Sequence, residues 1–310
     1  MVGSDYPPIK MTSNIPKVLK KLEWMKNQKI WPNGKRYLWT DSYGIILLVS
    51  LYKETNQIKY LNEAESVIQD VKKVLGRKKG LRIGEEPDRD GQYFHYLMKW
   101  VYALNEIGKY IPKYHLEAIT TIKDIHPHFF IPNKGILWKM KEDLSASYPG
   151  YGFGGLDHFD AFVTYRQVDP LELGNEISQV YHLVKRDYKN FTCTQDLGLG
   201  ETLWMTSHYP EEDWSIHMKN YCINNLNEMW VSKSQKEGYF MRDLMWERNY
   251  ILAFGNFGVS IGLQSVKLWT QRVTKLHEFF ETFRSNDKYD MEAITHVMHC
   301  NSLFPGVLIK

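Results

Sequence analysis

The chain has 310 residues, of which 43% are hydrophobic and 24% charged, and a net charge of +3 at neutral pH. These values are ordinary for a globular protein, and the small net charge argues against nucleic acid as a partner. The cysteines lie far apart, without a CxxC pair, and the N-terminus shows no signal-peptide pattern. The longest apolar run is too short to span a membrane. We therefore expect a cytoplasmic protein.

The apolar pattern predicts helices of two kinds. Some segments are apolar on nearly every side, which is typical of helices surrounded by protein, and others carry one apolar stripe and one polar face. In chain order they are 40–52 (apolar), 60–75 (one-sided), 91–108 (apolar), 116–125 (one-sided), 156–168 (apolar), 173–184 (one-sided), 198–209 (apolar), 249–266 (apolar) and 266–283 (one-sided). A last buried helix is expected at 290–300. Two short segments, 135–140 and 237–243, are the best strand candidates.

This alternation of buried and one-sided helices predicts a fold with inner and outer helices in about six hairpins. We expect an all-α (α/α)6 toroid, a closed barrel that forms a single domain over residues 1–310. An open α-solenoid is the alternative. A solenoid should show a repeat at a fixed period, and the buried segments begin at unequal intervals with no shared repeat pattern.

Polar side chains gather where the buried helices begin. In a toroid the inner helices run in one direction, so these starts meet at one mouth of the barrel. The residues are Trp39 and Asp41; Asp88, Arg89, Asp90, Gln92, Tyr93, His95 and Tyr96; Asp157, His158 and Asp160; Glu201; and Trp246, Glu247 and Arg248. An acidic residue at a helix start is often only a cap. Burying so many polar groups without partners is costly, so together they indicate a pocket for a polar ligand.

Carboxylates in an aromatic-lined pocket are typical of proteins that act on sugars, where two carboxyl groups divide acid and base work. We expect Asp90 and Glu201 or Asp157 to be the catalytic pair, with Asp160 and Glu247 as further carboxylates at the mouth. The glycine-rich segment 148–160 lacks a phosphate-binding motif and supplies an aromatic loop above the mouth. The expected substrate-binding residues are Trp39, Asp41, Arg89, Gln92, Tyr93, His95, Tyr151, His158, Asp160, Trp246 and Arg248.

The same residues carry a resemblance to a known group of proteins. The strings Trp39–Asp41, Asp88–Tyr96, Asp157–Asp160 and Trp246–Asn249, together with Glu201, resemble the six-hairpin glycosidase-like superfamily, in an uncharacterised branch. The resemblance implies an (α/α)6 toroid that acts on carbohydrates at the mouth of the barrel. It implies a small-molecule or oligosaccharide substrate, and we expect no cofactor, metal, nucleic acid or membrane partner.

Other functions remain open from the sequence. A sugar epimerase or isomerase would use histidines, for which His95, His158, His208 and His299 are candidates. A toroid that only binds carbohydrate or peptide needs no catalytic pair. A terpene cyclase is less favoured, because no DDxxD or DxDD string is present. A zinc enzyme would use His296, His299 and Cys300, which share one face of the last helix.

Overall fold

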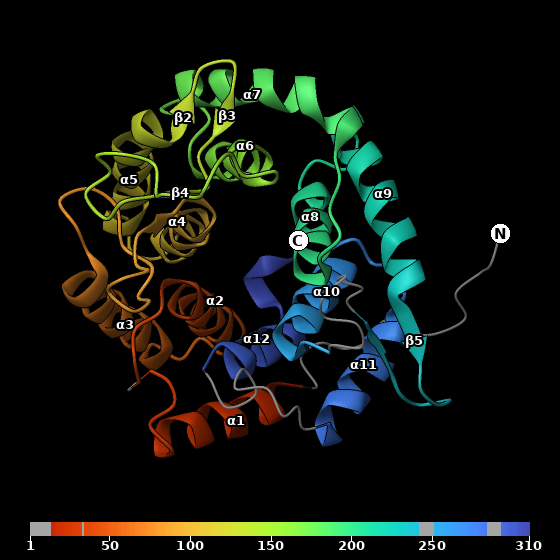
Figure 1. Cartoon of the computed structure of the whole chain (residues 1–310). Coiled ribbons are helices and arrows are strands. Elements are labelled where there is room, and N and C mark those ends of the chain that lie inside the picture. The colour runs from red at the N-terminus through yellow and green to blue at the C-terminus, as the bar shows by residue number, and fades with distance from the viewer. Residues whose placement is uncertain (1–13, 33, 242–250, 284–292) are drawn as a thin grey trace.

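The computed structural model describes residues 14–32, 34–241, 251–283 and 293–310, and these contain twelve α-helices. Figure 1 looks along the axis of a ring in which one set of helices lies inside and another outside. The inner helices are α2 (Leu38–Thr55), α4 (Phe94–Gly108), α6 (Asp157–Val168), α8 (Asp196–Ser207), α10 (Ala253–Ser265) and α12 (Ala293–Leu303). The outer helices are α1 (Ile15–Asn27), α3 (Lys59–Leu75), α5 (Lys113–Phe129), α7 (Gly174–Asp187), α9 (Asp213–Met229) and α11 (Thr270–Thr282).

The inner ring is closed. Each inner helix packs against the next from α2 to α12, and α12 in turn packs against α2. The outer helix α1 contacts α12, so the first and last helices form one of the six hairpins. This closure confirms the (α/α)6 toroid and excludes the open solenoid. Among the described residues, no helix combines the length and apolarity needed to cross a membrane.

Burial follows the two predicted kinds of helix. In α2 every residue from 38 to 51 is buried, whereas in α3 the buried positions 60, 64, 67, 71 and 75 mark one face. Each large apolar side chain removed from water contributes roughly 1.5–3 kcal/mol to folding. The inner helices therefore supply most of the core, and the outer helices cover it with one stripe each.

The helices differ from the sequence pattern at one boundary and in two helices that the pattern did not predict, α1 and α9. The predicted helix 266–283 is wrong at its start, because α10 ends at Ser265 and α11 begins at Thr270. Trp269 between them has a φ of 50°, a left-handed conformation that no α-helix continues through. The sequence analysis named no helix over α9, although Trp214, Met218, Cys222 and Leu226 recur every four residues there and are buried.

Three short pairs of antiparallel strands lie in the loops between the helices of the ring. They are β1 (Gln92–Tyr93) with β4 (Lys139–Met140), β2 (Phe130–Ile131) with β3 (Gly135–Ile136), and β5 (Trp230–Ser232) with β6 (Gly238–Phe240). Both predicted strand segments, 135–140 and 237–243, contain strands of these pairs. The β1–β4 pair matters most for the site, since it fastens the start of α4 to the loop that carries Tyr151.

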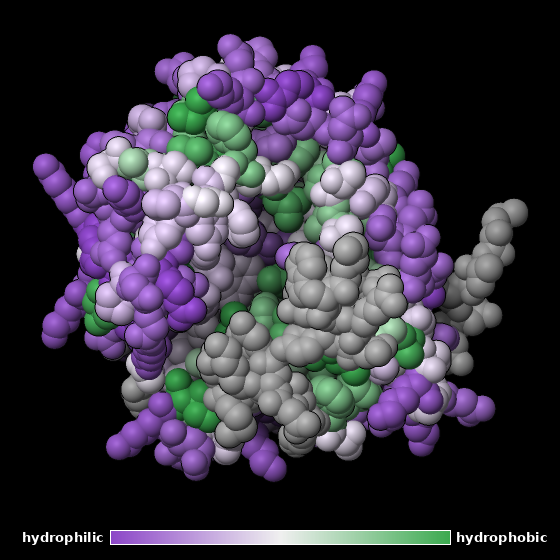
Figure 2. Space-filling view, viewed as in Figure 1, coloured by the Kyte–Doolittle hydropathy of each residue, from purple (hydrophilic) through white to green (hydrophobic). Residues whose placement is uncertain are grey.

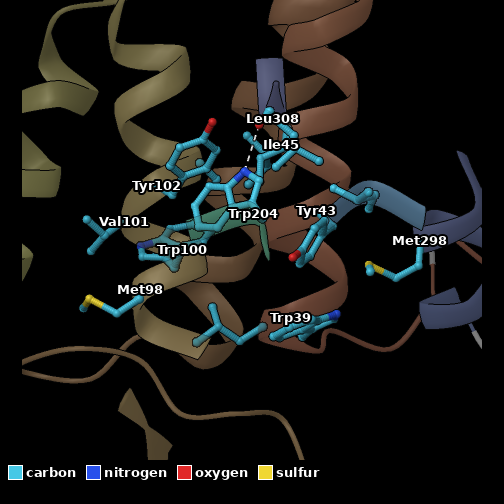
Figure 3. Packing of buried hydrophobic residues seen from close by; sticks show 14 of the residues in the cluster. Trp39, Tyr43, Ile45, Met98, Trp100, Val101, Tyr102, Trp204, Met298 and Leu308 are labelled. Carbon is cyan, nitrogen blue, oxygen red and sulfur yellow. Dashed lines mark hydrogen bonds between the residues drawn. The ribbon is translucent and has the colours of Figure 1, made fainter. Parts of the chain in front are cut away.

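The end of the chain covers the barrel at the side where the inner helices end. A short 3-10 turn, η4 (Gly306–Leu308), lies under the ring. Its backbone accepts hydrogen bonds from the Tyr102 hydroxyl to Val307 O (2.8 Å) and from Trp204 Nε1 to Leu308 O (2.8 Å). Figure 3 shows the second bond, with Trp39 at the opposite end of the same apolar cluster. At the other side, viewed in Figure 2, the surface is hollowed near the centre, and the most hydrophilic residues lie around the periphery of the molecule.

Candidate active site

A histidine lies between two carboxylates at the start of α4. His95 Nδ1 is 3.0 Å from Asp160 Oδ2 on α6, and His95 Nε2 is 2.9 Å from Glu201 Oε2 on α8. The side chain of His95 is 18% exposed, while those of Asp160 and Glu201 are at most 5% exposed. Three inner helices therefore bring together one partly exposed imidazole and two carboxylates that are almost fully buried.

A buried lysine completes this charged group. Lys99, one turn after His95, places Nζ 3.1 Å from Asp160 Oδ1 and 3.7 Å from Glu201 Oε1. Its ammonium also lies 4.7 Å from the centre of the Trp204 ring. The Tyr43 hydroxyl on α2 donates to Glu201 Oε1 at 3.4 Å, which adds a fourth inner helix to the site.

The charges within this group stabilise one another. Burial disfavours the charged imidazole, but Glu201 and Asp160 outweigh it and raise the pKa of His95 to about 10. The same two carboxylates outweigh burial at Lys99 and raise its pKa, whereas Lys99 and His95 lower the pKa of Asp160 despite its burial. The cationic forms of His95 and Lys99 and the anionic form of Asp160 are thus favoured together in the folded protein.

Asp157 has a different environment one turn before Asp160. It is 3% exposed, and its Oδ1 has no hydrogen-bond partner among the described residues. Burial raises the pKa of Asp157 to about 7; the His95 cation opposes this rise, and the neighbouring Asp160 and Glu201 charges add to it. Asp157 is therefore a carboxylic acid that holds its proton up to about neutral pH, near Asp160, whose pKa is lowered.

Aromatic side chains surround the exposed edge of His95. The Trp39 ring lies 5.1 Å from His95, and Tyr96 lies 5.2 Å from Trp39. Tyr93 contacts Tyr96 at 5.2 Å and Tyr151 at 6.1 Å between ring centres. The predicted aromatic residues Trp39, Tyr93 and Tyr151 thus lie in one connected set that begins at His95.

Asp41 and Asp90 have partners of another kind. Asp41 accepts hydrogen bonds from Trp31 Nε1 (2.9 Å) and the Tyr37 backbone N–H (3.2 Å), and Arg36 pairs with it at 3.2 Å. Its burial raises its pKa to about 6. These are the contacts of a carboxylate that organises the start of α2, and none of the described contacts joins Asp41 to His95 or Glu201.

Asp90 organises a loop in the same way. Its Oδ1 accepts the backbone N–H groups of Ile83 (3.1 Å), Gly84 (3.2 Å) and Gly91 (2.8 Å), and its other oxygen pairs with Arg82. A carboxylate with four donors has little capacity left for a substrate. The described contacts do not bring Asp90 to Glu201 or Asp157, so we assign Asp90 to the structure of the mouth.

The other predicted binding residues are divided between structure and surface. Gln92 is buried and donates through Nε2 to Lys79 O (2.9 Å) and Glu142 O (2.6 Å), and Arg89 is exposed. His158 lies on the outer side of α6, 3.4 Å from Asp187 at the end of α7, and burial lowers its pKa to about 4. Three further predictions lie outside the described residues: Trp246, Glu247 and Arg248.

The possible zinc ligands do not converge. His299 stacks on Phe257 at 4.5 Å, and its Nδ1 is 2.9 Å from Lys21 Nζ, while Cys300 is fully buried with a pKa raised by burial to about 12. Within the described ranges, no group of three or more His, Cys, Asp or Glu side chains is placed to hold a metal ion. His208, at the end of α8, is also remote from His95; burial lowers its pKa to about 3.

Lys99 and Tyr43 were not among the site residues predicted from the sequence. A signal for Lys99 was available, since a lysine within a helix that is apolar on all sides needs a buried partner. Its spacing of four residues from His95 also places both on one face of α4. Tyr43 gave no such signal, because tyrosine is common among core residues.

A second hollow lies on the outside of the ring. It has a volume of about 780 Å³ and lies between α7 and the segment that leads into α9, lined by residues such as Phe162, Tyr181 and Trp214. None of its lining residues belongs to the group around His95. Size alone does not make it the functional site. Its ionisable lining residues include Arg166 and Glu212, which pair with each other at 2.8 Å, and its described lining residues include no histidine held between two buried carboxylates.

Comparison with known proteins shows the fold. No family model matches the chain, and no curated protein matches it in sequence. Among solved structures, a D-mannose isomerase superposes with a TM-score of 0.67 at 13% identity, covering 97% of this chain and 100% of that one. A GH76 α-mannanase from Bacteroides thetaiotaomicron gives 0.64 at 9% identity, covering 96% of both chains.

A cellobiose 2-epimerase from Bacillus thermoamylovorans gives a TM-score of 0.61 at 11% identity, covering 92% of this chain and 86% of that one. These neighbours are (α/α)6 toroids named for action on carbohydrates, and at such low identity they establish the architecture alone. The chain therefore has the (α/α)6 toroid fold of these structures, the fold that the resemblance seen in the sequence implies.

Proposed function

We propose that the protein is a carbohydrate-active enzyme in which Asp157 is the general acid and Glu201 the general base or nucleophile, and that it hydrolyses glycosides. One observation carries the proposal: a buried carboxyl group whose Oδ1 has no hydrogen-bond partner among the described residues lies near a second carboxyl group that His95 and Lys99 contact. Asp157 is buried with its pKa raised to about 7, whereas Glu201 is contacted by the cations His95 and Lys99. Such a division is what acid and base roles require.

In this mechanism Asp157 protonates the oxygen of the glycosidic bond as it breaks. Glu201 acts at the anomeric carbon, either directly or by removing a proton from water. His95 and Lys99 hold Glu201 in place through the contacts described above and keep its negative charge stable. Asp160, bound to both cations, is a positioning residue that fixes the orientation of the imidazole.

The test uses 4-nitrophenyl glycosides and disaccharides of mannose and glucose as probes. Asp157→Asn and Glu201→Gln should each lower kcat/KM by about 10²–10⁴-fold, the range that general acid–base catalysis supplies. The exposed Glu211→Gln is a matched control and should retain activity. Asp157→Asn should impair disaccharides more than 4-nitrophenyl glycosides, because 4-nitrophenolate leaves without a proton. Equal loss on both substrates contradicts the acid role.

The pH profile gives an independent check. Because Asp157 must carry its proton to act as the acid, kcat/KM of the wild type should fall as pH rises through about 7. This descending limb should disappear in Asp157→Asn, which has no proton to lose. A limb that persists at the same pH in the variant assigns the acid to another group.

A second candidate is a sugar isomerase or epimerase. It is favoured by the position of His95, whose side chain is the most exposed of the charged group, and by the names of several structural neighbours. Such an enzyme would exchange the C2 hydrogen of mannose or glucose with solvent. Uptake of deuterium at C2 in D2O that is lost in His95→Asn, with no glycoside hydrolysed, would select this reaction.

A further inference from the structure

An aromatic wall runs from the charged group to the rim of the barrel. Starting at His95, the rings of Trp39, Tyr96, Tyr93 and Trp138 follow one another at centre-to-centre distances of 5.1, 5.2, 5.2 and 6.0 Å. The last two rings are nearly parallel, with an interplanar angle of 19°. Each step is within contact distance, so the wall is continuous.

Exposure increases along this wall. Trp39 is 1% exposed, Tyr96 and Tyr93 are half-buried, and Trp138 is 46% exposed. A tryptophan is usually among the better-covered residues of a core, so one with nearly half its surface in water at the end of an aromatic wall indicates a contact surface. The wall thus leads from the reacting groups to an open indole.

The rim is rigidly built. Trp138 donates its backbone N–H to Gly152 O (2.9 Å), and its carbonyl accepts the N–H of Phe94 (3.1 Å) at the start of α4. Next to it, the buried Lys139 places its ammonium 4.3–4.9 Å from the rings of Tyr93, Tyr148 and Tyr151. These cation–π contacts fasten the loop with Tyr151 to the wall, so its rings are positioned before any ligand binds.

We propose that Trp138, with Tyr93 and Tyr151, forms a second sugar subsite, so that the substrate is a di- or oligosaccharide rather than a single sugar. This inference rests on the proposed function and specifies its substrate class. One sugar ring occupies the space beside His95 and Asp157, and the next stacks its apolar face on Trp138. The Tyr93 hydroxyl donates to the Tyr151 hydroxyl at 3.5 Å, so the O–H of Tyr151 is the group that can donate to a sugar hydroxyl.

Binding measurements separate this subsite from catalysis. Isothermal titration calorimetry measures the Kd of two disaccharides, cellobiose and an α-linked mannobiose, and of the monosaccharides glucose and mannose. The proteins are the wild type, Trp138→Ala and Trp138→Phe. Tyr110→Ala is the matched control. Tyr110 is also an exposed aromatic residue (39% exposed), but it lies just after the last residue of α4, at the end of the helix opposite to His95. All measurements are repeated in the Asp157→Asn background, in which turnover is suppressed.

We expect the wild type to bind at least one disaccharide about tenfold more tightly than its monosaccharide. Trp138→Ala should remove this difference without changing the monosaccharide Kd, Trp138→Phe should retain most of it, and Tyr110→Ala should have no effect. The subsite is overturned if the wild type binds no disaccharide more tightly than its monosaccharide. It is also overturned if Trp138→Ala keeps the tighter binding of the disaccharide. A gain that depends on Trp138 without any glycoside hydrolysis supports the subsite and rejects only the hydrolytic reaction.

Discussion

Asp157 is a buried carboxyl group whose neutral form the fold favours. Its Oδ1 finds no protein donor among the described residues, and Asp160 and Glu201 add to the rise in its pKa that burial causes. Ionising it would place a charge in a buried position where that oxygen has no donor. This arrangement lowers stability, and the proposed role of Asp157 as general acid accounts for it.

This cost predicts a pH-dependent stability. The pKa of Asp157 is raised from 3.8 to about 7 in the folded state, so between pH 4 and 7 the unfolded chain releases a proton that the folded chain retains. Stability is therefore lost as pH rises through this window. Asp157→Asn should be more stable than the wild type at pH 8, by on the order of 4 kcal/mol at most, and equal to it near pH 3.5.

Urea unfolding at pH 3.5, 5.5 and 8 measures the difference. Glu211→Gln, which changes an exposed carboxylate, should follow the wild type at every pH. A variant Asp157→Asn that is less stable than the wild type at pH 8 would mean that the carboxylate is favourably bound in the folded protein.

At the scale of elements, the helix starts position the site and glycines allow the helices to approach. The pair α8 and α10 is the closest example. A Cβ added to Gly262 would lie 2.1 Å from the carbonyl oxygen of Gly200, and one added to Gly200 would lie 2.6 Å from the backbone of Gly258. The two backbones thus touch directly, and α8 in turn carries Glu201.

Gly262→Ala should therefore destabilise the protein, because rigid backbone has to move to admit the methyl group. We expect a loss of at least about 1–3 kcal/mol, the usual cost of overpacking a core. Gly174→Ala is the control, since a Cβ at the start of α7 meets open space, and it should be neutral or slightly stabilising. Thermal unfolding of both variants measures the loss. Equal melting temperatures would mean that α8 and α10 can move apart to admit the methyl group without loss of stability.

At the scale of the whole molecule, the ring is held from below by the end of the chain. The segment around η4 bonds to Ser50 of α2 (3.0 Å), Tyr102 of α4 and Trp204 of α8. It therefore ties together three inner helices that also supply Tyr43, His95 and Glu201 to the site at the other end. The geometry of the mouth depends on a ring that is closed on the opposite side.

Leu308→Ala should accordingly weaken the whole barrel. Leu308 is 3% exposed beneath the ring, and truncating a buried leucine costs about 2–5 kcal/mol. Ile309→Ala, at a more exposed neighbouring position, should cost clearly less. Melting temperature and protease resistance measure the stability of both variants. Similar values for the two would show that the segment around η4 does not stabilise the ring.

The sequence by itself determined the fold class, the two kinds of helix and the polar helix starts, because helical periodicity and burial are local properties of the chain. It could not rank the carboxylates. Asp90 and Asp157 both follow loops and precede buried segments, yet Asp90 is saturated by backbone donors and Asp157 is not. Only the tertiary structure decided this, because the number of donors around a carboxylate depends on segments distant in sequence.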